Sequence, residues 1–333
     1  MMKKERQAYA STKVSLLVFL VAIMFVAVLF SFRFSIENMK NNQQSGINGL
    51  LMLIEFERIE GVLQWEKELD ARKMTALVKA QDNVLENNPE VFRRLASKGY
   101  EIAGGYDQAA LWDMPYEQQY QLLKNSKEKV ERITGFPMKV FGGRYFSYDE
   151  NTLKAADALG IEYILGRGTR DVEAVIYQPK EYKVKIISVT NVDVGGTMGR
   201  GSLCDYSLWA RGADPASFGA MINESIAKQP ANIILVSHSY LGGTRVEWWA
   251  EYQKALESLS VNWRGFGNWI KNQKLIKLPN AEIPINREVK YTVPNPAKAI
   301  EDYTPISCAS FSEEKSDVSQ GPLLRWLDRK SVV

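Results

Sequence analysis

Histidine is almost absent from this chain of 333 residues, in which His238 is the only one. A single histidine excludes HExxH metalloproteases and two-histidine iron sites, and a zinc centre would need carboxylates and at most two cysteines as further ligands. The chain also has no GxSxG elbow and no GxxxxGKS or GxxxxGKT loop, which argues against serine hydrolases with that elbow and against nucleotide binding. We therefore expect neither a metal site nor a cofactor.

The chain has almost no net charge outside its first 13 residues. Those residues hold four basic side chains and one acidic one, and the remainder has 38 of each sign. A neutral domain has no field that would hold phosphates, which argues against nucleic acid as a partner. Cysteine is limited to Cys204 and Cys308, and the sequence leaves open whether these form a disulfide or remain two buried thiols.

One long uncharged run interrupts this ordinary composition. Residues 14–32 contain no charged side chain, and as a helix they would span roughly 28 Å, about one hydrocarbon core. The run continues into Phe-Ser-Phe-Arg without a small-x-small cleavage site, which favours an uncleaved signal anchor over a cleaved signal peptide. Because four basic residues precede it, we expect a single-pass membrane protein with a cytoplasmic tail (residues 1–13) and an extracytoplasmic main domain.

The rest of the chain divides into three parts by composition. Residues 33–48 are polar and are typical of a tether. Residues 49–278 alternate buried strand patterns with amphipathic helix patterns, and residues 184–192 (VKIISVTNV) are one of the predicted strands. This alternation predicts a largely parallel α/β sheet, either a barrel or a doubly wound sheet. Residues 279–333 are rich in proline, which predicts an extended appendage and tail.

The single histidine has two interpretations. His238 follows the apolar run IILVS, and the carboxyl end of a buried parallel strand is where α/β active sites form. Its alternative is a structural histidine that is hydrogen-bonded to a neighbour. Tryptophan is abundant, and exposed tryptophans stack on sugar rings, so Trp248 is a candidate for glycan binding, although most tryptophans lie in cores.

The order of segments from about residue 49 to 260 resembles the polysaccharide deacetylase family, the NodB-like carbohydrate esterases. NPEVFRRLASKGYEIAGG is similar to the helix and strand that lead to the family's metal-binding histidines. TGFPMKVFGGRYFSYDENTLKAADALGIEYIL resembles the family's third motif and its following helix and strand, and ANIILVSHS resembles the strand that ends in its leucine-histidine motif. The resemblance implies a distorted (β/α) barrel with its site at the carboxyl ends of the strands.

The motifs depart from the family pattern at the metal site. The family's catalytic aspartate and its metal-binding aspartate fall on Glu57 and Arg58, so a cation replaces an oxygen ligand. The family's two metal-binding histidines fall near Gly105 and Ala109, which have no ligand atoms, and His238 matches the catalytic acid. An intact member would need a divalent metal to polarise the acyl carbonyl and activate water. We therefore expect a protein that has kept the fold and lost or altered the reaction.

Three functions follow from this interpretation. The first is a membrane-anchored protein that binds cell-surface glycan, or a partner of the envelope machinery, through the former catalytic cleft. The second is an active deacetylase or esterase that works without metal, and the third is a structural subunit of a membrane assembly. The candidate catalytic residues are Glu57, Arg144 and His238, and the candidate substrate-binding residues are Arg58, Tyr106, Asp107, Tyr145, Asp171 and Trp248.

Overall fold

The computed structural model describes residues 46–55, 59–195, 199–288 and 298–306. The proposed anchor at residues 14–32 lies outside these ranges, as do Glu57, Arg58 and Cys308. Within the described residues, no helix is both long and apolar enough to cross a membrane. The residues from Ile47 onward form one compact unit, and the fold described below is the fold of that unit.

The centre of this unit is a curved sheet in the strand order β10-β1-β2-β3-β4-β5-β7-β6-β12, with β11 also paired to β1. Neighbouring strands are parallel except β6 and β7, which are antiparallel, and β8 and β9 form a separate antiparallel pair. The prediction of a largely parallel sheet is thus confirmed. The strands are β1 Ile47–Glu55, β2 Leu77–Gln81, β3 Glu101–Tyr106, β4 Val140–Gly143, β5 Tyr163–Gly166, β6 Val175–Pro179, β7 Lys185–Ser188, β8 Asn191–Asp193, β9 Arg200–Ser202, β10 Asn232–His238, β11 Val261–Arg264 and β12 Leu275–Leu278.

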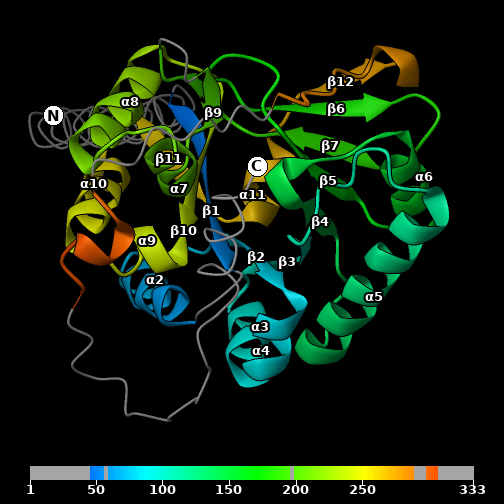
Figure 1. Cartoon of the computed structure of the whole chain (residues 1–333), viewed down its shortest axis with the longest axis horizontal. Helices are drawn as coiled ribbons and strands as arrows, with labels where there is room; N and C mark the ends of the chain where they lie inside the picture. The colour runs from blue at the N-terminus through cyan, green and yellow to red at the C-terminus, as the bar shows by residue number, and fades with distance from the viewer. Residues whose placement is uncertain (1–45, 56–58, 196–198, 289–297, 307–333) are drawn as a thin grey trace, which may run out of the picture. The chain divides into compact units, whose positions relative to one another are not determined.

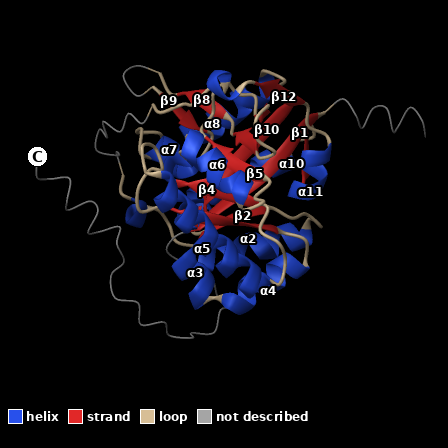
Figure 2. Cartoon of the chain, turned by 90° about the vertical axis from the view of Figure 1, so that its right-hand side faces the viewer, coloured by secondary structure: helices blue, strands red, loops and turns tan. Residues whose placement is uncertain are grey.

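Helices cover the outer face of the sheet, as Figures 1 and 2 show. Two of their ends follow the sequence signals directly. Asp149 caps α6 by accepting a hydrogen bond from the backbone N–H of Thr152, and Gly135 ends α5 with φ of 78°. The helices are α2 Glu60–Ala71, α3 Asp82–Asn87, α4 Pro89–Ser97, α5 Tyr116–Thr134, α6 Glu150–Ala158, α7 Asp205–Trp209, α8 Pro215–Ala227, α9 Ser239–Gly242, α10 Val246–Glu257 and α11 Phe266–Lys271, with 3₁₀ turns η1 Arg144–Phe146, η3 Asn280–Glu282 and η4 Ile300–Asp302.

Apolar residues form two separate layers on the two faces of the sheet. On β1, Leu51 and Leu53 belong to the outer layer, together with helix residues such as Trp65. Met52 and Ile54, which alternate with them, belong to the inner layer. Residues of α11 also join the inner layer, and Trp269 donates its indole N–H to the carbonyl of Asn48, so α11 closes the amino end of the inner face.

The sheet is a half-barrel, because the described strands do not close into a continuous ladder. The prediction of a single strand over residues 184–192 is wrong, because this segment is divided between β7, which ends at Ser188, and β8, which begins at Asn191. The chain leaves the main sheet after Ser188, and Thr190 then accepts a hydrogen bond from the backbone N–H of Leu203. Leu203 in turn accepts one from the backbone N–H of Val236 on β10. The segment around Leu203 therefore spans the opening that a further strand would fill.

The segment after β12 is extended along the ends of the strands. Within residues 279–288, Pro284 accepts a hydrogen bond from the Tyr148 hydroxyl, and Arg287 pairs with Asp113 at 2.9 Å. Within residues 298–306, backbone hydrogen bonds join Thr304 to Val246 and Ile306 to Thr244. These contacts attach the described parts of the appendage to loops that follow β3, β4 and β10.

Candidate functional site

The carboxylate of Asp205 lies at the carboxyl end of the sheet. It is fully buried at the start of α7. Its Oδ1 accepts hydrogen bonds from the backbone N–H groups of Tyr206 at 2.6 Å and His238 at 2.9 Å. Its Oδ2 accepts from the Ser237 hydroxyl at 3.2 Å and from the backbone N–H of Gly242 at 2.9 Å. These four donors satisfy the buried charge and fix the carboxylate beside the end of β10.

Asp205 orients the imidazole of His238. The ring Nδ1 lies 3.3 Å from Asp205 Oδ1 and 3.0 Å from the Sγ of Cys204, and the side chain is 13% exposed. The Nδ1 edge is therefore the buried edge of the ring. A carboxylate beside one ring nitrogen fixes the orientation of the imidazole, an arrangement that acid–base catalysis uses. The sequence-predicted acid His238 thus has a positioning partner.

Cys204 completes this cluster as a buried thiol. Burial and then the neighbouring Asp205 charge raise the pKa of Cys204 well above its usual range, so the side chain stays protonated and is not an activated nucleophile. Within the described residues Cys204 is a free cysteine. We infer a structural role for Cys204, in which its sulfur contacts the imidazole that Asp205 holds.

Aromatic rings surround the histidine. The Tyr206 ring centroid lies 5.0 Å from that of His238 and 5.4 Å from that of Trp209, and Tyr240 lies 5.9 Å from His238. Tyr206 and Trp209 are half-buried residues that pack against the outer apolar layer. Trp209 also donates its indole N–H to the carbonyl of Lys298, which fixes the ring. This cluster offers an aromatic surface next to the candidate acid.

A second charged group lies on the inner face of the sheet, on β2. Lys79 is 2% exposed, and its ammonium donates to both carboxylate oxygens of Asp107, at 2.7 and 2.5 Å. Its stem passes over Gly105 and Gly142, where an added Cβ would lie 3.1 to 3.3 Å from Lys79 carbons. Glycines at these two positions of β3 and β4 therefore make the space that the lysine side chain fills.

The strand register places the two charged groups at one level. Ile54 of β1 is the register partner of both His238 on β10 and Lys79 on β2. With adjacent strands about 4.8 Å apart, the Cα atoms of His238 and Lys79 are roughly 10 Å apart. Both residues share the inner-face alternation of Ile54. The sheet thus brings together His238 and the Lys79–Asp107 pair at its carboxyl end.

The predicted residues Arg144 and Tyr145 form a turn directly after β4. Arg144 donates to the carbonyl of Gln108 at 2.9 Å and lies 4.8 Å from the centroid of the Tyr145 ring. Tyr145 and Phe146 both have positive φ, 59° and 54°. Two consecutive non-glycine residues in this region store backbone strain, and such strain concentrates at functional sites. Arg144 therefore links the loops that follow β3 and β4.

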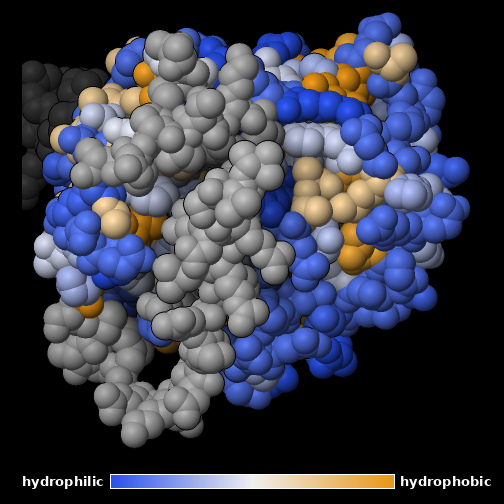
Figure 3. All heavy atoms as spheres, viewed as in Figure 1, coloured by the Kyte–Doolittle hydropathy of each residue, from blue (hydrophilic) through white to orange (hydrophobic). Residues whose placement is uncertain are grey.

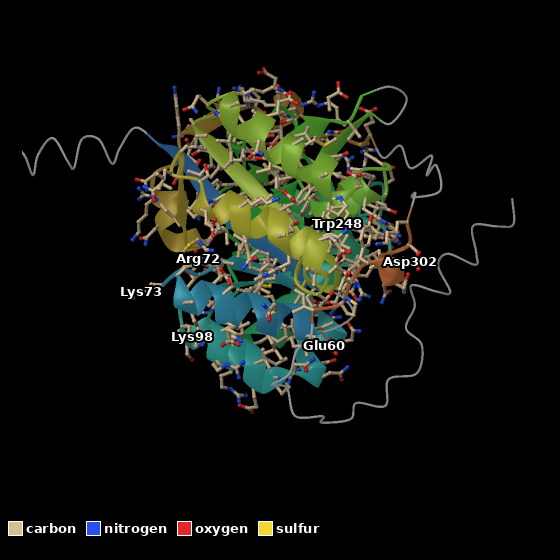
Figure 4. The ribbon with its side chains drawn as sticks, turned by 90° about the vertical axis from the view of Figure 1, so that its left-hand side faces the viewer. Glu60, Arg72, Lys73, Lys98, Trp248 and Asp302 are labelled. Carbon is tan, nitrogen blue, oxygen red and sulfur yellow. The ribbon has the colours of Figure 1, made fainter. Side chains whose placement is uncertain are left out.

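Three other predicted substrate-binding residues lie elsewhere. Trp248 belongs to α10 and is fully buried, and its ring contacts Tyr303, the residue after Asp302 (Figure 4). It is a core residue, and the predicted contact with sugar is wrong. Tyr106 packs against the outer apolar layer and faces away from Lys79. Asp171 pairs with Arg200 and Lys228, and Lys228 precedes β10 whereas His238 ends it. Glu57 and Arg58 lie outside the described residues.

Sequence reasoning missed Asp205 and Lys79. Asp205 is the first residue of a short helix and is 33 residues from His238, so only the fold brings the two together. Lys79 did carry a signal, because it interrupts the apolar run ALVKA at an inward-facing position of β2. A charged residue in the middle of a buried strand pattern indicates a specific partner.

A family model described as polysaccharide deacetylase matches residues 62–164, which confirms the resemblance inferred from the sequence motifs. This segment is therefore similar to polysaccharide deacetylases. No curated protein sequence is significantly similar to it.

Solved structures show the same fold at low sequence identity. A protein assigned to the polysaccharide deacetylases from Mycobacterium smegmatis superposes with a TM-score of 0.54 and 13% identity, covering 70% of this chain and 94% of its own. One assigned in the same way from Pseudomonas aeruginosa PAO1 gives 0.52 and 16%, covering 69% and 91%. The PuuE allantoinase gives 0.52 and 14%, covering 68% and 90%. At these sequence identities, the similarities show a shared fold and nothing further.

The described residues do not fit the divalent cation that the family implies. Lys79 already neutralises Asp107, the carboxylate nearest to the family's histidine positions. Within the described ranges, the one cluster of three ligand-type side chains is Cys204, Asp205 and His238. Its Sγ and Nδ1 are 3.0 Å apart, whereas thiolate and imidazole ligands at about 2.3 and 2.0 Å from a tetrahedral zinc would be roughly 3.5 Å apart. Asp205 is also saturated by backbone and hydroxyl donors.

Proposed function

We propose that this chain is a membrane-anchored, extracytoplasmic protein that binds cell-surface glycan at the carboxyl end of its half-barrel and has lost metal-dependent deacetylation. One observation carries the proposal: the Lys79 ammonium is bound to Asp107 on the side of the sheet where the family resemblance expects metal ligands. A buried ammonium repels a divalent cation, and its partner carboxylate is no longer available as a ligand. The deacetylase fold supports glycan as the ligand class.

The residues around His238 support retention of glycan binding. Tyr206 and Trp209 present half-buried rings, and aromatic faces stack on the apolar faces of sugar rings. Asp205 and His238 supply fixed polar groups beside these rings. A glycan site needs such a combination of a flat apolar surface and convergent polar groups.

The proposed cellular location comes from the sequence. The uncharged run at residues 14–32 and the four basic residues before it support a single-pass anchor with the N-terminus in the cytoplasm. Reporter fusions on either side of the run test this topology. Protease protection of the domain in inverted membrane vesicles, together with its digestion in intact spheroplasts, is the expected pattern.

Glycan binding tests the proposal through Trp209. We expect the full chain in mild detergent to bind N-acetylated oligosaccharides, and Trp209→Ala to weaken that binding about tenfold because a stacking surface is removed. Trp263→Ala is the matched control, since Trp263 also donates its indole N–H to a backbone carbonyl, that of Ala255, on another part of the fold. Equal affinities of the wild type and the Trp209 variant, by calorimetric titration, would place the glycan elsewhere.

The intact Asp205–His238 pair favours a second candidate function, hydrolysis of an amide or ester on a sugar without metal. In that case His238 donates a proton to the leaving group and Asp205 positions it. Its test is turnover of acylated oligosaccharides in the presence of EDTA. Activity that His238→Asn removes and Trp263→Ala preserves would support the enzyme over the binding protein.

A further inference from the structure

The lysine on β2 requires an explanation, because burial of an ammonium in an apolar layer is costly. Lys79 lies between the inner-layer residues Leu77 and Ala103 on the same face of the sheet. An apolar residue of similar length would fill the same space without desolvating a charge. Gly105 and Gly142 open that space to the lysine stem at the level of the candidate acid. Burial of the Lys79 charge therefore costs free energy, which a functional role of the ammonium would explain.

The pair is positioned at the boundary of the inner face and solvent. Lys79 comes from the middle of β2, and Asp107 follows the last residue of β3. The Asp107 side chain is 16% exposed while that of Lys79 is 2% exposed, so the pair borders solvent on the side of its carboxylate. Among the described residues, Asp107 is the hydrogen-bond partner of the ammonium. An ammonium has three donors, and one carboxylate engages at most two of them.

We propose that the Lys79 ammonium is the ligand-binding cation of this site, which donates a hydrogen bond to the acyl oxygen of an acylated amino sugar in place of a divalent metal ion. The inference rests on the proposed function and names the group through which the glycan is recognised. Asp107 holds the ammonium in place and neutralises it. The site then works without metal, because its positive charge belongs to the chain.

The charge balance selects the class of ligand. Lys79 and Asp107 cancel, so their pair attracts no net anion, and the nearby Asp205 adds a negative charge to the site. A neutral carbonyl oxygen accepts from the ammonium without disturbing this balance. A free amino sugar has no acyl oxygen, so it cannot accept this hydrogen bond from the Lys79 ammonium. The site should therefore distinguish acylated from deacylated sugars.

Binding of two matched oligosaccharides to the full chain tests the inference. The probes are a chitin oligomer and its fully deacetylated counterpart, both in EDTA, with affinities from calorimetric titration. We expect the wild type to prefer the acetylated oligomer and Lys79→Met to lose that preference by at least about tenfold, because the charge-assisted hydrogen bond is removed. Met keeps the length of the stem over Gly105 and Gly142. Lys129→Met is the control, as Lys129 forms a 2.9 Å ion pair with Asp82 among the helices.

The Asp107→Asn variant distinguishes a role of Lys79 in ligand binding from a purely structural role of the Lys79–Asp107 ion pair. This variant breaks the ion pair but keeps the ammonium and an acceptor oxygen, so we expect it to retain the preference for the acetylated oligomer. Near-ultraviolet circular dichroism checks that each variant is folded. The inference fails if Lys79→Met and Asp107→Asn lose the preference for the acetylated oligomer equally, or if Lys79→Met keeps that preference. Either result would leave the proposed glycan binding intact. No binding of either oligomer to the wild type would contradict the proposed function and this inference with it.

Discussion

The two halves of the carboxyl end of the sheet are built in opposite ways. On the β10 side, the Asp205 carboxylate accepts four hydrogen bonds from backbone and hydroxyl donors and orients the single histidine. On the β2–β3 side, glycines replace side chains and one ion pair, Lys79–Asp107, fills the space that they leave. The first half holds an imidazole beside a buried carboxylate, whereas the second holds an ion pair between two side chains of the chain itself.

The proposed function attributes this difference to loss of the metal-binding half of the site alone. The Asp205 carboxylate is tied into the fold, because its removal would leave several buried donors without a hydrogen-bond acceptor. Figure 3 shows one face of the protein, on which the described residues in view are largely hydrophilic with some hydrophobic groups among them.

The largest effect should come from the β10 side. We expect Asp205→Ala to lower the free energy of unfolding by about 3–5 kcal/mol, because four donors lose their acceptor inside the protein. Urea unfolding measures the change. Asp171→Ala is the control, since Asp171 is also ion-paired but 56% exposed and should cost less than about 1 kcal/mol. Equal effects of the two substitutions would contradict the hydrogen-bond network.

The β2–β3 side should give a smaller loss that a compensating change reverses. Asp107→Ala leaves the Lys79 ammonium buried without its partner, and we expect a loss of about 2–4 kcal/mol. Lys79→Met combined with Asp107→Leu removes both charges and should recover most of that stability in the same urea experiment. A double variant as unstable as Asp107→Ala alone would mean that packing, and not the unpaired charge, causes the loss.

The fold was predictable because its signals are local. Apolar runs, the Asp149 cap and the glycine after Thr134 define strands and helices without reference to distant residues. For the candidate site, the sequence pointed to residues that match family motifs, such as His238 and Arg144, and their roles stay predictions. Asp205 and Lys79 act through partners far along the chain, and Trp248 is buried by packing against Phe218 and Tyr303, so periodicity gave no information on any of the three.

An ion pair outside both halves should give the smallest effect and a dependence on pH. Burial alone would raise the pKa of Glu66, but hydrogen bonds from Arg94 and Lys98, which join α2 to α4, outweigh burial and lower it (Figure 4 labels Lys98). A carboxyl with a lowered pKa stabilises the fold fully above its unfolded-state pKa and loses that contribution as the pH falls through its folded-state pKa.

We therefore expect Glu66→Gln to cost about 1–2 kcal/mol above roughly pH 5, and the difference from the wild type to shrink below that pH. Thermal unfolding from pH 7 to pH 3 checks the sign. Glu90→Gln, at an exposed i,i+3 pair with Arg93 on α4, is the control and should change stability little at any pH. A difference that grows on acidification would contradict the assignment.

The central claim is that the acid half of the site remains while the metal half is gone. The most direct test is acetate release from N-acetylated and O-acetylated oligosaccharides by the full chain, with added Zn²⁺ and with EDTA. The account predicts that added Zn²⁺ stimulates no release and that EDTA leaves glycan binding unchanged. Release that Zn²⁺ stimulates and EDTA abolishes would contradict it, because such a result requires a metal site that the Lys79–Asp107 pair should exclude.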